Sequence, residues 1–355
     1  MVASVVGSKA IGVASKARSG SDDLARCCGV VMDWGRQLSG VNELELRILW
    51  RARQGLGLTD RPFLQLAQEL DLSEEQVLQC LRAMLRRRVL HHLGPIYFNE
   101  AFGQGLSLAG MQVPENALDA VNARLQANPV VVHLGTFRHP FNLWFTVAGN
   151  GEQAKAQNCR AIEANLGYPV FHLPSQAEFF GHARRERTCE PAQAVLSELD
   201  WRLIELTSPG LPLLPEPYRE WANILAVSLD ELYLRFQRLT EWGILQRIAA
   251  SPNYCRMGLR ASALTVWDVA DDAVSEYGAL FSELPAVSQC SLRPRYRPDW
   301  PYNLMVMVHG RTRREVGLQV AAMERLLGRH CHAHEVLFRR RLLKRAKEWP
   351  LQGIG

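Results

Sequence analysis

The stretch that decides the fold covers residues 62–90, PFLQLAQELDLSEEQVLQCLRAMLRRRVL, and it returns at residues 217–245 as PYREWANILAVSLDELYLRFQRLTEWGIL. A constant offset of 155 residues aligns the two segments without a gap, so that Ser73 matches Ser228. The likeness begins at the Glu43/Glu198 pair and continues for about sixty residues. Self-similarity at a fixed offset indicates repeated copies of one structural unit. The chain is therefore expected to be a tandem duplication.

The repeated segment has the signals of successive helices. Pro62 suits the first turn of a helix, where its missing N–H leaves no hydrogen bond unmade. Ser73 with Gln76, and Ser228 with Glu231, have the spacing of a capping box at the start of the next helix. Only a very short turn separates these two helices, so the pattern predicts a helix-turn-helix in each copy. Segment 89–98, with Gly94-Pro95 at its centre, predicts a hairpin wing behind the first one.

The second part of each copy alternates strand and helix patterns. In the first copy we expect strands at 106–113, 130–137, 142–148 and 169–173, and helices at 115–126 and 153–166. The second copy runs in parallel, from a strand beginning at Ala263 to a helix at 313–327. The order βαββαβ is that of a ferredoxin-like domain. The predicted fold class is α+β, a tandem repeat of winged helix-turn-helix and ferredoxin-like domains.

These patterns divide the chain into five expected segments. They are a poorly ordered extension at 1–40, winged helix-turn-helix domains at 41–100 and 191–256, and ferredoxin-like domains at 101–190 and 257–347. Residues 1–40 are rich in Gly, Ala, Ser and Val and show no sustained helical period, which favours disorder.

Composition narrows the class of protein. The chain has 355 residues, 47% of them apolar, and no apolar run approaches the length of a membrane span. Its eight cysteines include no C-x-x-C pair, which favours reduced thiols and a cytoplasmic protein without membrane association. The net charge of +5 favours an anionic partner.

Two corresponding segments carry unusual chemistry. Residues 293–304 place three arginines at alternate positions before an aromatic run, and residues 133–144 offer histidines instead. The offset between the copies has grown to 161 at the Asn142/Asn303 pair, so the second copy gains about six residues at its arginine cluster. An insertion at one such place indicates a functional loop.

A DNA-binding regulator is the first functional hypothesis, since the helix-turn-helix pattern occurs twice. The helix of each unit that would enter the DNA groove, the reading helix, argues against this hypothesis. The first turns of the two reading helices are Glu74-Glu75-Gln76 and Leu229-Asp230-Glu231. A helix that enters the major groove needs cations or amides there, and carboxylates are repelled by the phosphates. We therefore expect no specific DNA binding.

The motifs resemble the siroheme decarboxylase family, with its two homologous subunits joined in one chain. The likeness covers about residues 41–347 and rests on His133, His139, Phe141-Asn142-Leu143-Trp144-Phe145, Val266-Trp267-Asp268-Val269, Arg295, Asp299-Trp300-Pro301-Tyr302-Asn303-Leu304 and His309-Gly310-Arg311. The resemblance implies an Lrp/AsnC-like fold, and two joined copies would form an internal pseudo-dimer, with further homo-oligomerisation open. It also implies loss of two acetate carboxyl groups from siroheme, giving didecarboxysiroheme for d-type haem or for an alternative haem route. Gly135 and Phe137 stand where the family leads us to expect Tyr and Arg.

The resemblance also assigns roles. Siroheme is an anionic iron tetrapyrrole with eight carboxylates, so its site needs bidentate cations, apolar or aromatic faces and a proton source. His139 and His133 are the expected catalytic residues, and His139 is the candidate axial ligand of the substrate iron. The expected substrate-binding residues are Arg293, Arg295, Arg297, Tyr296, Trp300, Tyr302, Asn303, Asn142, Trp144 and Arg138. No cofactor is expected beyond the iron of siroheme.

Two alternatives stay open. A regulator that senses a tetrapyrrole would show the same binding residues without turnover. The motif His330-x-His332-x-His334 could share a strand face and bind a metal, but it has no evident acidic partner or further ligand.

Overall fold

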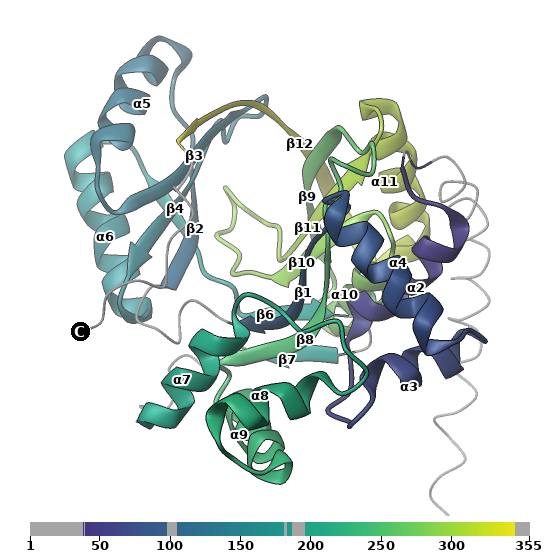
Figure 1. Cartoon of the computed structure of the whole chain (residues 1–355). Helices are drawn as coiled ribbons and strands as arrows, with labels where there is room; N and C mark the ends of the chain where they lie inside the picture. The colour runs from purple at the N-terminus through teal and green to yellow at the C-terminus, as the bar shows by residue number, and fades with distance from the viewer. Residues whose placement is uncertain (1–37, 39, 98–104, 181–182, 187–195, 345–355) are drawn as a thin grey trace, which may run out of the picture.

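A computed structural model describes Leu38 and residues 40–97, 105–180, 183–186 and 196–344 (Figure 1). Nearly all of the extension expected at 1–40 lies outside the described residues. The first helix-turn-helix comprises α2 (Glu43–Gln54), α3 (Pro62–Glu69) and α4 (Glu74–Arg86), followed by β1 (Leu90–Tyr97). The second comprises α7 (Glu198–Thr207), α8 (Pro217–Leu225) and α9 (Leu229–Glu241), followed by β8 (Leu245–Pro252). The duplicated helices are confirmed.

The two predicted capping boxes differ. At Ser73 the box is complete, since its hydroxyl accepts the Gln76 N–H at 3.2 Å and the Gln76 side chain accepts the Ser73 N–H at 2.9 Å. Ser228 also accepts the backbone N–H of Glu231, but the Glu231 carboxylate does not return the bond. It pairs instead with Arg235 one turn along the helix, at 2.7 Å. The second box is therefore only half formed.

The predicted hairpin wing is wrong. β1 runs straight through Gly94 and Pro95 and pairs antiparallel with β8 of the other copy. A Cβ on Gly94 would lie 2.8 Å from the backbone nitrogen of Leu211, so this glycine serves a close backbone approach and not a turn. Within the described residues, β1 and β8 form a sheet of only two strands, so β1 has an unpaired edge. Pro95, which has no N–H to donate, is tolerated at such an edge.

The second parts of the copies are both ferredoxin-like. The first comprises β2 (Gly105–Met111), η2 (Glu115–Ala117), α5 (Leu118–Ala127), β3 (Val131–Phe137), β4 (Leu143–Gly149), α6 (Gly151–Leu166) and β5 (Val170–Leu173). The second comprises β9 (Ala261–Val269), α10 (Val274–Glu283), β10 (Val287–Leu292), β11 (Leu304–Gly310), α11 (Arg313–Leu327), η3 (Gly328–His330) and β12 (Cys331–Lys344). Within each, the strands lie in the spatial order fourth, first, third, second (β5-β2-β4-β3 and β12-β9-β11-β10). The α+β fold class is confirmed.

Strands that cross between the copies join the two sheets. β12 pairs with β9 of its own copy as far as Phe338, and with β3 of the first copy from Arg339 onward. In the corresponding place after β5, β6 (Ala177–Phe180) pairs with β10 of the second copy and then with β7 (Ala183–Glu186). This reciprocal exchange is the pattern expected of an internal pseudo-dimer. No helix in the described part of the chain is long and apolar enough to cross a membrane.

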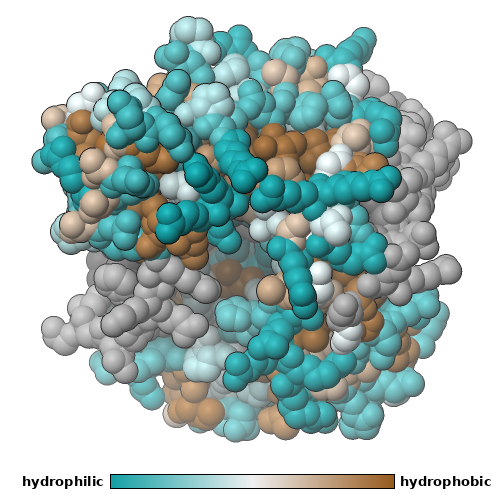
Figure 2. Space-filling model, turned by 90° about the horizontal axis from the view of Figure 1, so that it is seen from above, coloured by the Kyte–Doolittle hydropathy of each residue, from teal (hydrophilic) through white to brown (hydrophobic). Residues whose placement is uncertain are grey.

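The layers follow from which face of each sheet is apolar. α5 and α6 cover the outer face of the first sheet, and α10 and α11 cover that of the second (Figure 1). The inner faces are turned toward one another. The loop after β10 runs between them, and its Trp300 is fully buried there. Viewed from above, the molecule is hollowed between its halves, with hydrophilic residues around the rim (Figure 2).

Candidate functional site

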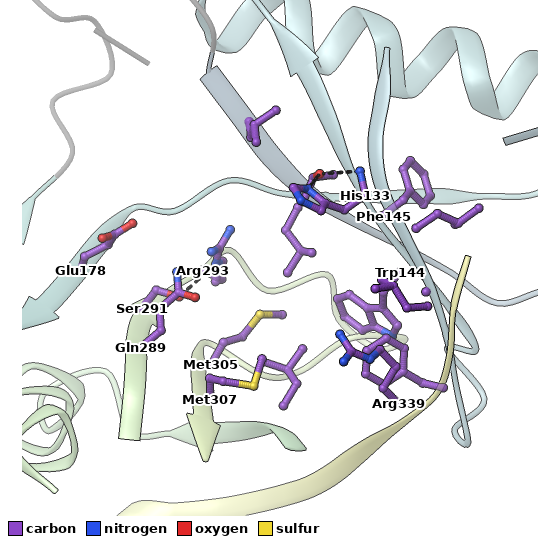
Figure 3. A pocket seen from close by; sticks show the side chains of 18 of the residues that line it. His133, Trp144, Phe145, Glu178, Gln289, Ser291, Arg293, Met305, Met307 and Arg339 are labelled. Atoms are coloured by element: carbon purple, nitrogen blue, oxygen red, sulfur yellow. Dashed lines mark hydrogen bonds between the residues drawn. The ribbon is translucent and has the colours of Figure 1, made fainter. Parts of the chain in front are cut away.

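A cavity of about 640 Å³ lies between the inner sheet faces. Its walls are mainly apolar: Leu106, Leu108, Leu134, Phe137, Trp144, Phe145, Leu264, Met305, Met307 and Leu342 line it. Polar groups enter at His133, Thr146, Glu178, Gln246, Gln289, Ser291, Arg293 and Arg339. In Figure 3, His133 and Trp144 come from the first sheet, and Met305 and Met307 face them from the second. A mostly apolar cavity with a few converging polar groups is typical of a ligand site.

The loops at one end of the two sheets differ in length. Residues 138–142 join β3 to β4, whereas residues 293–303 join β10 to β11. The six-residue gain of the second copy therefore falls at this loop, as predicted. Asn142 and Asn303 hold corresponding loop ends: the Asn142 amide exchanges two hydrogen bonds with the backbone of Val113, and the Asn303 amide does so with Val269.

Aromatic rings from both loops close that end of the intersheet space. The Trp300 ring packs edge-on against Phe141, Trp144 and Tyr302, with ring centroids 5.0, 5.2 and 4.8 Å away. We call Phe141, Trp144, Trp300 and Tyr302 the aromatic cluster. Trp144 also lines the cavity, so the cluster forms part of its wall.

The three predicted arginines have different surroundings. Arg293 lines the cavity, where its guanidinium donates to Ser291 and to the carbonyl of Leu173. Arg295 is occupied by the protein itself: it donates to Asp268 at 2.8 Å, to Asp271 and to the carbonyl of Val269. The hydrogen bond from Arg295 lowers the pKa of the Asp271 carboxyl.

Arg297 is more exposed than Arg295, with 61% of its side chain accessible, and lies 3.4 Å from Asp268. Tyr296 donates its hydroxyl proton to the carbonyl of His172, and Arg138 is the exposed first residue of the short loop. These three residues do not line the cavity.

Of the two predicted histidines, His133 lines the cavity and His139 does not. The Nδ1 of His133 lies 3.0 Å from the hydroxyl of Thr146. The ring of His139 lies edge-on to that of Trp300, with centroids 6.4 Å apart. Its Nδ1 accepts the N–H of Phe141 at 3.0 Å, so its proton sits on Nε2, which contacts Glu335.

Glu335 connects this histidine to the second copy. Its other oxygen accepts the Tyr302 hydroxyl at 2.9 Å. Burial, and then this hydrogen bond, raise the pKa of Tyr302. Both ring nitrogens of His139 therefore have protein partners, and Glu335 holds the ring against the long loop.

Sequence patterns had singled out His133, Trp144 and Arg293, and all three line the cavity. They had not indicated Glu178, Gln246 or Arg339, which reach it from β6, β8 and β12. No group of three or more His, Cys, Asp or Glu side chains suited to a metal ion occurs among the described residues.

Two family models match the chain. An AsnC-like ligand binding domain matches residues 256–344, and a siroheme decarboxylase NirDL-like helix-turn-helix domain matches residues 45–90. The siroheme decarboxylase NirH subunit of Pseudomonas aeruginosa is 43% identical over 44% of this chain and 89% of its own length. The siroheme decarboxylase of Hydrogenobacter thermophilus is 29% identical over 80% of this chain and 88% of its own length.

Two solved structures of siroheme decarboxylases also match this chain. The crystal structure of the siroheme decarboxylase NirDL is 28% identical, with a TM-score of 0.57, and the match covers 85% of this chain and 93% of that one. A second one, of NirDL with an iron-uroporphyrin III analogue, has a TM-score of 0.55 and 28% identity, over 86% of this chain and 93% of that one.

Fold and cavity thus define a fused pair of Lrp/AsnC-like units with a cavity between their sheets. The chain belongs to the siroheme decarboxylase family, and it is an enzyme of the carboxy-lyase type.

Proposed function

We propose that this enzyme removes the carboxyl groups of two acetate side chains of siroheme to give didecarboxysiroheme. The observation that carries the proposal is the cavity between the inner sheet faces, in a chain whose relatives over most of its length are siroheme decarboxylases. A relative solved with an iron-uroporphyrin III analogue supports an iron tetrapyrrole as the ligand class. The step serves the formation of d-type haem or an alternative haem route.

The cavity supplies what the reaction needs. Its apolar residues and Trp144 offer faces for a flat macrocycle, and the guanidinium of Arg293 can hold a peripheral carboxylate through parallel hydrogen bonds. When carbon dioxide leaves an acetate, the electron pair of the broken bond stays on the methylene carbon, which must then take up a proton. We assign this proton transfer, which leaves a methyl group, to His133, because His133 lines the cavity and its Nδ1 lies 3.0 Å from the Thr146 hydroxyl.

His139 is the second candidate acid and the candidate axial ligand. His139 does not line the cavity but lies against Phe141 and Trp300 of the aromatic cluster, and Glu335 and Phe141 engage both of its ring nitrogens. Iron ligation by His139 therefore requires the Glu335 contact to open. A His139→Ala variant that binds siroheme with an unchanged visible spectrum would argue against ligation.

We also propose that turnover needs no cofactor beyond the iron of siroheme, takes place in the cytoplasm and involves no specific DNA. The strands that follow the two helix-turn-helix units support the last point, because β1 and β8 pair with each other instead of forming hairpins. In the first reading helix, Glu74 pairs with Arg61, and the acidic first turn adds no cation for a phosphate.

Anaerobic incubation of the chelator-treated protein with siroheme, followed by mass spectrometry, tests the function. We expect two successive losses of carbon dioxide without any added cofactor. An unchanged tetrapyrrole with a shifted Soret band would instead support a sensor. Turnover only after addition of a metal or organic cofactor would contradict the cofactor proposal alone.

A further inference from the structure

Arg339 enters the cavity at a position that no sequence motif marked. It lies on β12 opposite Phe137 of β3, where the last strand of the second copy crosses to the first sheet. Its side chain lines the cavity beside Trp144 (Figure 3). A side chain from the far end of one copy therefore contributes to the inner face of the other.

Gly135 makes room for this side chain. A Cβ built on Gly135 would lie 3.5 Å from Cδ of Arg339 and 3.3 Å from the carbonyl oxygen of Arg341. A large residue here would extend into the space that the Arg339 side chain crosses. The same crossing brings Arg339 opposite Phe137 of β3.

The electrostatic surroundings of Arg339 differ from those of Arg295. Arg295 already holds two aspartates, so its charge is neutralised within the protein. The guanidinium of Arg339 makes no hydrogen bond or ion pair with any described residue, whereas the neighbouring Arg340 pairs with Glu115 at 2.9 Å. Arg339 is thus a fork of donors at the cavity without an acceptor in the described protein.

We propose that Arg339 binds a peripheral carboxylate of the tetrapyrrole from β12. The proposal rests on the proposed function, since that function supplies the anionic ligand. A guanidinium and a carboxylate form two parallel hydrogen bonds, which fix orientation as well as affinity.

Glu178 also lines the cavity, from β6, the other crossing strand, and accepts a hydrogen bond from Gln246 at 3.0 Å. One crossing strand thus presents an acid to the cavity and the other a base.

The test compares Arg339→Gln, Arg339→Lys and Arg340→Gln in the full chain. Arg340→Gln is the matched control, because it removes the same charge from an adjacent position whose partner is a surface glutamate. Dissociation constants are measured by Soret titration with siroheme and with haem b, which carries fewer carboxylates. Circular dichroism checks that each variant is folded.

We expect Arg339→Gln to weaken siroheme binding about ten- to one-hundred-fold, the loss typical of a charge-assisted hydrogen-bonded pair. The affinity of Arg339→Gln for haem b should change much less than its affinity for siroheme. The siroheme affinity of Arg339→Lys should lie between those of the parent and Arg339→Gln, and that of Arg340→Gln should stay within about twofold of the parent. The inference is overturned if Arg339→Gln binds siroheme as the parent does, or if Arg340→Gln weakens it equally. Parent protein that neither binds nor decarboxylates siroheme would instead overturn the proposed function.

Discussion

Two tryptophans of the aromatic cluster allow a matched stability experiment. Trp144 and Trp300 are 3% and 0% exposed, and their rings lie 5.2 Å apart. The indole N–H of Trp144 donates to the carbonyl of Phe141 at 2.8 Å, whereas that of Trp300 is buried with no acceptor among the described residues. Replacement by phenylalanine removes the same atoms from both sites, so the cost of lost packing is shared.

The difference between the variants comes from the hydrogen bond. Trp144→Phe loses that bond and leaves the Phe141 carbonyl without its indole donor, whereas Trp300→Phe removes a buried donor that was already unsatisfied. An unsatisfied buried group costs about 1–3 kcal/mol. We therefore expect Trp144→Phe to lower the free energy of unfolding by about 2 kcal/mol more than Trp300→Phe. With an unfolding entropy of about 2.1 cal/mol/K per residue, the melting temperatures of the two variants should differ by roughly 3 °C for a chain of 355 residues.

Urea unfolding followed by far-ultraviolet circular dichroism measures this difference without relying on the fluorescence of the mutated residues. The denaturant dependence of the two variants should match, because they expose similar surface on unfolding. A Trp300→Phe variant as destabilised as Trp144→Phe, or more so, would refute the reasoning. It would mean that the Trp300 indole has an acceptor in solution.

Three further predictions concern the site and its surroundings. Replacing the proton donor by alanine, in His133→Ala or His139→Ala, should lower siroheme turnover by a factor of about one hundred to ten thousand. Stopped-flow absorbance measures the rate, and a variant with a normal rate would show that its histidine is not the donor. The Asp271 carboxyl, whose pKa lies below the ordinary 3.8 because Arg295 donates to it, stabilises the fold fully above that value and loses this contribution as the pH falls through its folded-state pKa. Acid should therefore narrow the difference in urea midpoint between the parent and Asp271→Asn, and a difference that does not shrink at any acid pH at which the parent stays folded would contradict the pairing. Finally, duplex DNA should bind only weakly and lose affinity with added salt, so a footprint that survives physiological salt would restore the regulator hypothesis.

The sequence by itself determined the local structure and the architecture. The offset of 155 residues located both helix-turn-helix units, and Ser73 marked the start of α4 through hydrogen bonds three residues away. The change of offset to 161 located the long loop between β10 and β11. These features depend on contacts between near neighbours or on comparison of the two copies, so they can be found without knowing which strands pair.

Only the tertiary structure decided which side chains share the cavity. Three arginines at alternate positions look equivalent in the sequence. In the structure, Arg295 forms ion pairs with Asp268 and Asp271, whereas Arg293 lines the cavity. Gly94 looks like a turn until the backbone at Leu211 is seen against it. Arg339 looks like part of a basic surface run until β12 crosses to β3 and places it over Gly135. Each outcome depends on segments far apart in the chain, and local patterns of hydrophobicity and charge carry no information about such pairing.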